Sequence, residues 1–142
     1  MTPRQIELVQ ASFARVAPIG DQTAALFYGR LFETEPGTRA LFAHADLAAQ
    51  GRKLMAAIGL VVGALRQPEA MLDAVRDLAR RHRGYGVQEH HYAAVGAALL
   101  WTLERGLGEG FTTETREAWA AAYGLLSGVM IEAAAGGDMA AA

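Results

Sequence analysis

The sequence contains no cysteine, and this absence excludes several kinds of chemistry. Without a thiol the chain can form no disulfide, no thiolate nucleophile and no sulfur-based zinc site. No apolar run approaches the ~18 residues that a membrane-spanning helix needs, and no apolar signal segment follows Met1. The net charge of −2 argues against nucleic-acid binding, which needs a basic surface. These features predict a cytoplasmic protein with neither a membrane nor a nucleic acid as partner.

Strand signals and internal repeats are also lacking. The β-branched residues are scattered through segments with helical periodicity, and the four prolines mark boundaries between such segments. A length of 142 residues, 52% of them hydrophobic, suits one domain with one core. The sequence therefore predicts a single all-α domain over residues 1–134, followed by a low-complexity tail at 135–142 that frays.

Capping residues and prolines divide the chain into six long or medium helices and a short one. Thr2 and Gln5 form a Thr-x-x-Gln capping box, and Asp21 and Asp46 are the expected N-caps of two later helices. The expected helices run from Pro3 to before Pro18, from Asp21 through Phe32, from Pro36 to near Phe42, from Asp46 to before Pro68, from Pro68 through His82, from about Gln88 to Leu107, and from Thr112 or Thr113 through Met130.

One histidine, His82, is expected on the apolar face of the helix that Pro68 begins. Met71, Val75, Leu78 and His82 are spaced by four, three and four residues, which places them on one face. A neutral imidazole in an apolar interior is typical of a buried metal ligand. The alternative is a core histidine that bonds to a backbone carbonyl, since buried polar groups normally find a partner. This stripe alone favours the core histidine.

Two further polar residues are expected to face inward. Gln50 shares a helical face with Leu47 and Leu54, and Tyr28 lies among apolar neighbours on another helix. An unpaired buried amide costs roughly 1–3 kcal/mol. These groups therefore either bond to nearby backbone or converge, together with His82, on a buried ligand in an apolar cavity.

The order and spacing of several short blocks carry a family resemblance. The blocks are LFYGRLF at 26–32, Glu35-Pro36, Leu41-Phe42, QGRKLM at 50–55, LARRH at 78–82, HYAAVG at 91–96 and WAAAYG at 119–124. In this order they resemble the globin family, closest to single-domain bacterial globins, the globin domain of flavohaemoglobins and neuroglobin-like chains. The resemblance covers Ile6 to Met130. It implies a globin fold, a three-over-three helical sandwich around a haem pocket.

The resemblance also implies a role for particular residues at a heme b (iron protoporphyrin IX). His82 matches the proximal histidine that binds the iron, Tyr28 the distal tyrosine of the flavohaemoglobin type, and Gln50 the distal position. Gly51 and Ala24 match small residues where two helices cross. The further residues that the resemblance assigns to the cofactor are Phe42 on the haem face, Leu54 over the iron, Lys53 toward a propionate, and Leu78, Val87 and Tyr92.

The implied ligand is dioxygen or another diatomic gas such as NO or CO. Tyr28 and Gln50 can donate hydrogen bonds to it, and a buried donor is stronger because water does not compete. Glutamine is a poor iron ligand, so a five-coordinate ferrous iron is expected. His44, in the loop at 43–46, is a candidate competing ligand. His90 and His91 are interpreted as solvated or capping side chains.

Two departures from the flavohaemoglobin pattern affect the expected chemistry. In that type a tyrosine and a glutamate of the last two long helices bond to the proximal histidine. Tyr92 matches the tyrosine, but Glu132 precedes the glutamate's expected place at 133–135 by about two residues. The sequence also has no flavin or nicotinamide domain, so any catalytic cycle would need a separate flavin reductase.

Three functions are compatible with this pattern. The first is reversible dioxygen binding for storage, transport or sensing. The second is nitric oxide dioxygenation by a bacterial haemoglobin that a partner reductase reduces again, because the same hydrogen bonds serve both activities. The third is a haem-free interaction module with a globin fold. His82, Phe42 and Tyr28 argue against this third function, because a haem-free module has no need of them.

Overall fold

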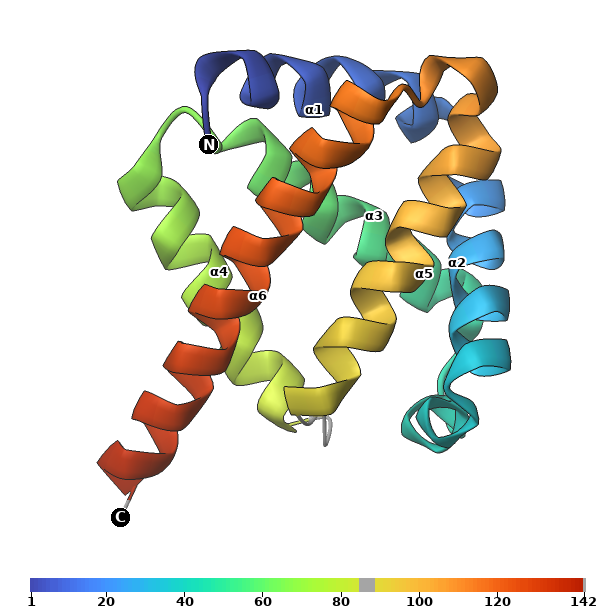
Figure 1. The fold of residues 1–142 in the computed structure, drawn as a ribbon. Coiled ribbons are helices and arrows are strands. Elements are labelled where there is room, and N and C mark those ends of the chain that lie inside the picture. The colour runs from blue at the N-terminus through green and yellow to red at the C-terminus, as the bar shows by residue number, and fades with distance from the viewer. Residues whose placement is uncertain (85–88, 142) are drawn as a thin grey trace.

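The computed structural model describes the backbone of residues 1–84 and 89–141, which in this part is helical and contains no strand (Figure 1). The side chains at 68, 71, 74, 81–84, 89–90 and 132–141 lie outside the description. The elements are α1 (Pro3–Val16), η1 (Ala17–Ile19), α2 (Gly20–Thr34), η2 (Pro36–Phe42), α3 (Leu47–Gly63), α4 (Pro68–Gly84), α5 (Glu89–Leu107), η3 (Gly108–Gly110) and α6 (Thr113–Ala141), where η denotes a 3₁₀-helix. The all-α prediction is confirmed.

The helices pack as pairs around a common interior. The turn at η3 joins α5 to α6, which run in opposite directions, with α2 beside α5 and α4 beside α6 (Figure 1). α1 lies across the end at which α5 and α6 meet, and α3 packs against α2.

Three helix starts follow the predicted caps. The Thr2 hydroxyl accepts from the Gln5 amide at 3.1 Å while the Gln5 side chain accepts from the Thr2 amide at 2.9 Å, which is the reciprocal capping box. Asp46 accepts from the first-turn amides of α3, the closer at 3.0 Å. Thr112, rather than Thr113, caps α6, because its hydroxyl accepts from the Thr115 amide at 3.1 Å. Each bond satisfies an amide that has no partner within its own helix.

The sequence prediction differs from the structure at one helix start, in one helix type and in the burial of one residue. α2 begins at Gly20 with Ile19 at the N-cap position, so Asp21 is not the cap but lies in the first turn. A carboxylate there still favours the positive end of the helix dipole. The short helix at Pro36–Phe42 is a 3₁₀-helix. The predicted apolar stripe of α3 included Leu47, but Leu47 is 42% exposed. It is the first residue of α3, whose buried residues begin only at Gly51.

The core divides into two apolar clusters. The larger draws on α1, α3, α4, α5 and α6, and its members include Val9, Val62, Val75, Leu103 and Trp119. The smaller joins α2 to α5 through Phe27, Tyr28, Leu31, Phe32 and Ala98. Burial of such side chains is the main stabilising contribution to the fold.

A polar link within the larger cluster connects α1 with α6. The Trp119 indole nitrogen donates to the Ser12 hydroxyl at 2.8 Å, and that hydroxyl donates to the Leu8 carbonyl at 2.6 Å. Both side chains are buried, so each polar group has a partner where water is excluded.

The close crossing expected at Gly51 is present. A Cβ added at Gly51 would lie 2.8 Å from the Ala24 Cβ, so α2 and α3 approach each other there as only a glycine allows. Past the end of α5, Gly108 has a positive φ of 55°, which its lack of a side chain permits.

Two further observations concern the membrane prediction and the tail. Across the part of the chain that the structure describes, no helix is both long and apolar enough to span a bilayer. The backbone of α6 continues as a helix to Ala141. Fraying of residues 135–142 in solution stays a prediction.

Candidate functional site

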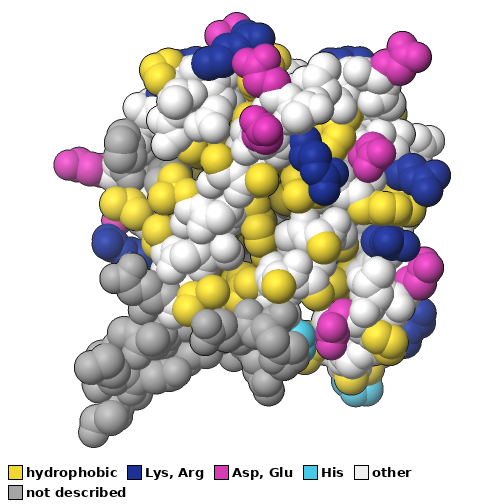
Figure 2. Space-filling view, viewed as in Figure 1, with side chains coloured by type: hydrophobic (Ala, Val, Ile, Leu, Met, Phe, Trp, Pro, Cys, Tyr) yellow, Lys and Arg dark blue, Asp and Glu magenta, His cyan; other side chains and the backbone are white. Residues whose placement is uncertain are grey.

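A cavity of about 160 Å³ occupies the space between the helix pairs. Figure 2 shows hydrophobic side chains between charged ones of both signs on the face that α5 and α6 form. The 160 Å³ cavity, which we call the main cavity, lies in the interior, and most of the side chains that line it are aliphatic or aromatic. The side chains that line it are Phe27, Tyr28, Leu31, Thr38, Leu41, Phe42, Leu54, Ala57, Ile58, Val61, Leu78, His91, Tyr92, Val95, Leu99, Tyr123, Leu126 and Met130.

Tyr28 is held in the wall of the main cavity by a group of aromatic rings. Its ring centroid lies 5.2 Å from that of Phe42 and 5.1 Å from that of Phe27, both in edge-on arrangements, and 6.0 Å from that of Phe32, which is stacked. Aromatic pairs prefer such geometries over a face-to-face sandwich. The rings therefore restrict the direction in which the Tyr28 hydroxyl can point.

The Tyr28 phenol remains protonated at neutral pH. The side chain is only 5% exposed, and burial raises the pKa of the phenol to about 12, because the charged form loses its hydration. A side-chain hydrogen bond with Gln50 lowers the pKa, although it does not outweigh burial. A neutral phenol keeps its O–H, so Tyr28 can act as a hydrogen-bond donor.

The structure brings four of the other predicted cofactor residues to the main cavity: Phe42, Leu54, Leu78 and Tyr92. Gln50 does not line the cavity, but it forms a side-chain hydrogen bond with Tyr28, which does. Lys53 is exposed and is not among the lining residues.

Two of the predicted residues fall outside the described part. His82 follows the cavity-lining Leu78 by four residues in α4, one helical turn further on, and its side chain is outside the description. Val87 lies outside the described residues altogether, and the side chain of Glu132 is likewise not described. The roles of all three stay predictions.

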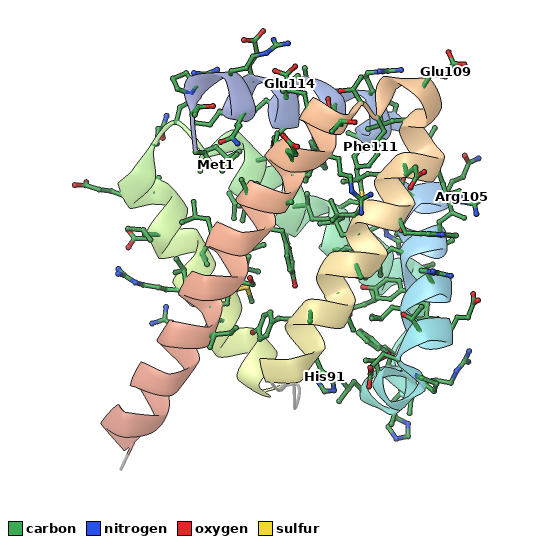
Figure 3. All side chains as sticks on the ribbon, in the orientation of Figure 1. Met1, His91, Arg105, Glu109, Phe111 and Glu114 are labelled. Atoms are coloured by element: carbon green, nitrogen blue, oxygen red, sulfur yellow. The ribbon has the colours of Figure 1, made fainter. Side chains whose placement is uncertain are left out.

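The interpretation of His91 as a solvated side chain is wrong. His91 is 8% exposed and lines the main cavity from the first turn of α5 (Figure 3). Adjacency to Glu89 and His90 suggested a polar helix end, but the inward face of α5 already begins at His91. His44, in contrast, is exposed and does not line the main cavity.

Sequence reasoning did not single out Tyr123 as a site residue. Its hydroxyl donates to the Tyr92 carbonyl, which joins α6 to the first turns of α5. Its ring lies so close to Gly96 that an added Cβ would be 2.5 Å from a ring carbon. Burial, and then the proximity of Tyr92, raise the pKa of Tyr123. The sequence contains one signal for Tyr123. It follows the buried Trp119 by four residues, so the two side chains lie on the same face of α6.

The walls of the main cavity suit a flat, largely apolar cofactor. Aromatic and aliphatic side chains line it from both helix pairs, and the Tyr28 hydroxyl supplies a hydrogen-bond donor. Among the described residues, no group of three or more His, Cys, Asp and Glu side chains could hold a bare metal ion. An iron held within a macrocycle requires only one ligand from the protein.

The fold and the main cavity together define a helical domain built to hold an apolar cofactor between its helices. Comparison with known proteins gives the family: the Globin family model matches residues 25–130, and the chain belongs to the globin family. The expected globin fold is thereby confirmed.

The chain is similar to longer proteins over most of its own length. It is 34% identical over 133 residues to a flavohemoprotein of Bordetella pertussis, and 32% identical over 133 residues to one of Deinococcus radiodurans. It is 30% identical over 132 residues to a flavohemoprotein of Rhizobium meliloti. Each match covers 92% of the chain and 33% of the relative. The chain thus spans about a third of the length of these relatives.

Proposed function

We propose that the chain is a haem globin that reversibly binds dioxygen, with NO and CO as alternative ligands, at a heme b held by His82. The observation that carries the proposal is the buried Tyr28 phenol, which stays protonated at neutral pH, in the wall of a largely apolar cavity. Membership of the globin family and similarity to flavohemoproteins support haem as the cofactor.

Several residues of the chain would hold the cofactor, each by a different contact. His82 would provide the ligand to the iron, and Phe42, Leu54, Leu78 and Tyr92 would provide apolar contact. When bound, haem would supply an iron that can bind a diatomic gas. The apolar walls exclude water, which keeps hydrogen bonds in the cavity strong.

Tyr28 is the residue to which we assign recognition of the gas. Its O–H is a donor that the cavity wall can offer to a ligand with partial negative charge. Gln50 orients that hydroxyl through their mutual hydrogen bond. The apolar walls alone give no preference between dioxygen and CO. A hydrogen bond from Tyr28 favours the more polar ligand, dioxygen.

Visible absorption spectra of the purified protein, in the ferric and then the ferrous state, test the proposal. We expect a Soret band, a ferrous form that is mainly five-coordinate, and a reversible change under dioxygen. His82→Ala should lose most of its haem, whereas His44→Ala, which changes an exposed side chain, should retain it. Full haem loading in His82→Ala would refute the ligand assignment, and a haem-free protein in every preparation would refute the proposed function.

The same preparation tests how far the chain alone carries nitric oxide dioxygenation. We expect the oxygenated protein to react with NO once and then stop, and sustained turnover to need an added flavin reductase. Steady consumption of NO with NADH alone, in the absence of any flavoprotein, would contradict this expectation.

A further inference from the structure

A groove between α5 and α6 opens on the face of the molecule that Figure 2 shows, and we call it the outer groove. Its volume of about 540 Å³ falls within the ~300–1,000 Å³ that is typical of small-molecule sites. Its lining residues come from α5 and α6, with Arg30 added from α2. Of these residues only Tyr123 also lines the main cavity, so the outer groove is a separate site.

The apolar part of the outer groove is open because its side chains are short. Ala97 and Ala120 are exposed, and a Cβ added at Gly124 would have nothing within 4 Å. The Tyr123 ring packs directly on the backbone of Gly96, where an added Cβ would be 2.5 Å from a ring carbon. Larger side chains at these positions would fill the space. The recess beside the Tyr123 ring therefore has room for a flat apolar body, and an aromatic ring gains a ring–ring contact there.

Arginines form the charged end of the outer groove, and Trp101 restricts the one that comes from α2. The guanidinium carbon of Arg30 lies 5.1 Å from the centroid of the Trp101 ring, and that of Arg105 lies 4.8 Å from it. These are cation–π distances, and a guanidinium stacked on a ring keeps its N–H donors for other partners. The ion pair of Arg30 with Glu33 is 3.7 Å long and lies at the surface, so it contributes little.

The charge of the outer groove is complementary to a monoanion. Arg30 and Arg116 line it together with Glu104, which leaves one net positive charge. Within the part of the chain that the structure describes, neither Arg116 nor Glu104 forms an ion pair. Because a guanidinium can bind a carboxylate through two parallel hydrogen bonds, one carboxylate group is the anion that fits this end best.

We propose that the outer groove binds an aromatic carboxylate. Arg30 and Arg116 bind the carboxylate group, and the aromatic ring lies against Tyr123 and Ala97. The proposal combines three observations: the volume of the groove, the short side chains beside the Tyr123 ring, and the excess positive charge at one end. It does not depend on which cofactor fills the main cavity.

Calorimetric titration of the purified protein with indole-3-acetate tests the proposal. We expect saturable binding at one site per chain. Indole lacks the carboxylate, so it should bind about tenfold more weakly, the factor that corresponds to the loss of one hydrogen bond to a charged group. Acetate lacks the ring and should show no saturable binding over the same concentrations.

Two matched arginine substitutions locate the bound carboxylate. Arg116→Gln removes an exposed charge that has no ion-pair partner among the described residues, so the fold should be retained while the Kd for indole-3-acetate rises about tenfold. Arg76→Gln makes the same change at an exposed position of α4, outside the outer groove, and should leave the Kd unchanged.

A second pair of substitutions tests the recess. Ala97→Leu fills it from an exposed position of α5 and should abolish saturable binding, whereas Ala25→Leu, on the exposed side of α2, should not. No saturable binding to the wild type would overturn the proposal. So would equal Kd values for indole and indole-3-acetate, or for the wild type and Arg116→Gln. Haem loading, read from the visible spectrum before the titration, tests the proposed function independently.

Discussion

Two tyrosines of the main cavity, the buried Tyr28 on α2 and the half-buried Tyr123 on α6, use their hydroxyl groups differently. Tyr28 bonds to a side chain, Gln50, which can change partner when a ligand enters. Tyr123 bonds to a backbone carbonyl, that of Tyr92, which holds its place in α5. Under the proposed function, the wall that carries Tyr28 would recognise the ligand, whereas the wall that carries Tyr123 would fix the shape of the cavity.

The largest effect is expected where Tyr123 meets α5. In Gly96→Ala the new Cβ would lie 2.5 Å from the Tyr123 ring, a distance that forces the ring or the helix to move. Overpacking of this kind lowers the free energy of unfolding by about 1–3 kcal/mol. Urea denaturation measures it.

Gly124→Ala is the matched control for this prediction. Nothing lies within 4 Å of a Cβ at Gly124, which is exposed on α6. There the change should raise the free energy of unfolding by about 0.5–1 kcal/mol, because alanine is the better helix former. Equal destabilisation by both variants would mean that the contact between Gly96 and Tyr123 is not the cause.

On the wall of the main cavity that carries Tyr28, Tyr28→Phe should raise the rate at which dioxygen dissociates. The variant keeps the ring contacts and removes the buried donor, a loss of roughly 1–3 kcal/mol, which corresponds to dioxygen dissociation about five- to a hundredfold faster. Gln50→Leu should have a smaller effect, because Gln50 acts through Tyr28. Stopped-flow displacement of dioxygen measures both. Identical dissociation rates in the wild type and Tyr28→Phe would exclude Tyr28 as the donor.

Tyr123→Phe should show the reverse pattern. Loss of the bond to the Tyr92 carbonyl lowers the free energy of unfolding by about 0.5–1.5 kcal/mol. Dioxygen dissociation should change less than in Tyr28→Phe. If Tyr123→Phe accelerated dissociation as strongly as Tyr28→Phe, the proposed division between the two walls would be wrong.

A smaller effect, confined to alkaline solution, follows from the raised pKa of Tyr28. The phenol has a pKa of about 12 in the folded chain against an ordinary value of 10.0, so its contribution to stability is fully present below pH 10 and is lost as the pH rises through 12. Tyr28→Phe should therefore lose less stability than the wild type between pH 10 and pH 12. Denaturant titrations at several pH values measure the difference, and parallel curves would contradict the assigned pKa.

Local features of the fold were predictable because they depend on neighbours in the sequence. The caps at Thr2, Asp46 and Thr112 involve backbone amides two or three residues away, so short patterns identify them. Asp21 was misassigned because Ile19 ends a 3₁₀-turn that runs directly into α2, a continuation that leaves no place for a side-chain cap.

The candidate site was predictable where helical periodicity determined it, as at Tyr28, Leu54 and Leu78. It was not predictable at His91 and Tyr123, because their positions depend on how α5 rotates against α6. That rotation is set by the close contact at Gly96, which joins residues far apart in the chain. The roles of His82 and Val87 rest on the sequence.

The bond between Trp119 and Ser12 has a consequence for the order of folding during synthesis. Its two residues are 107 positions apart, so α1 cannot reach its final partner until α6 has left the ribosome. At ordinary elongation rates that delay is on the order of 5–20 s. During this delay, α6 does not yet cover the apolar face of α1 that carries Val9 and Val16. Pairing of the first helix with the last also raises the native contact order, which slows folding.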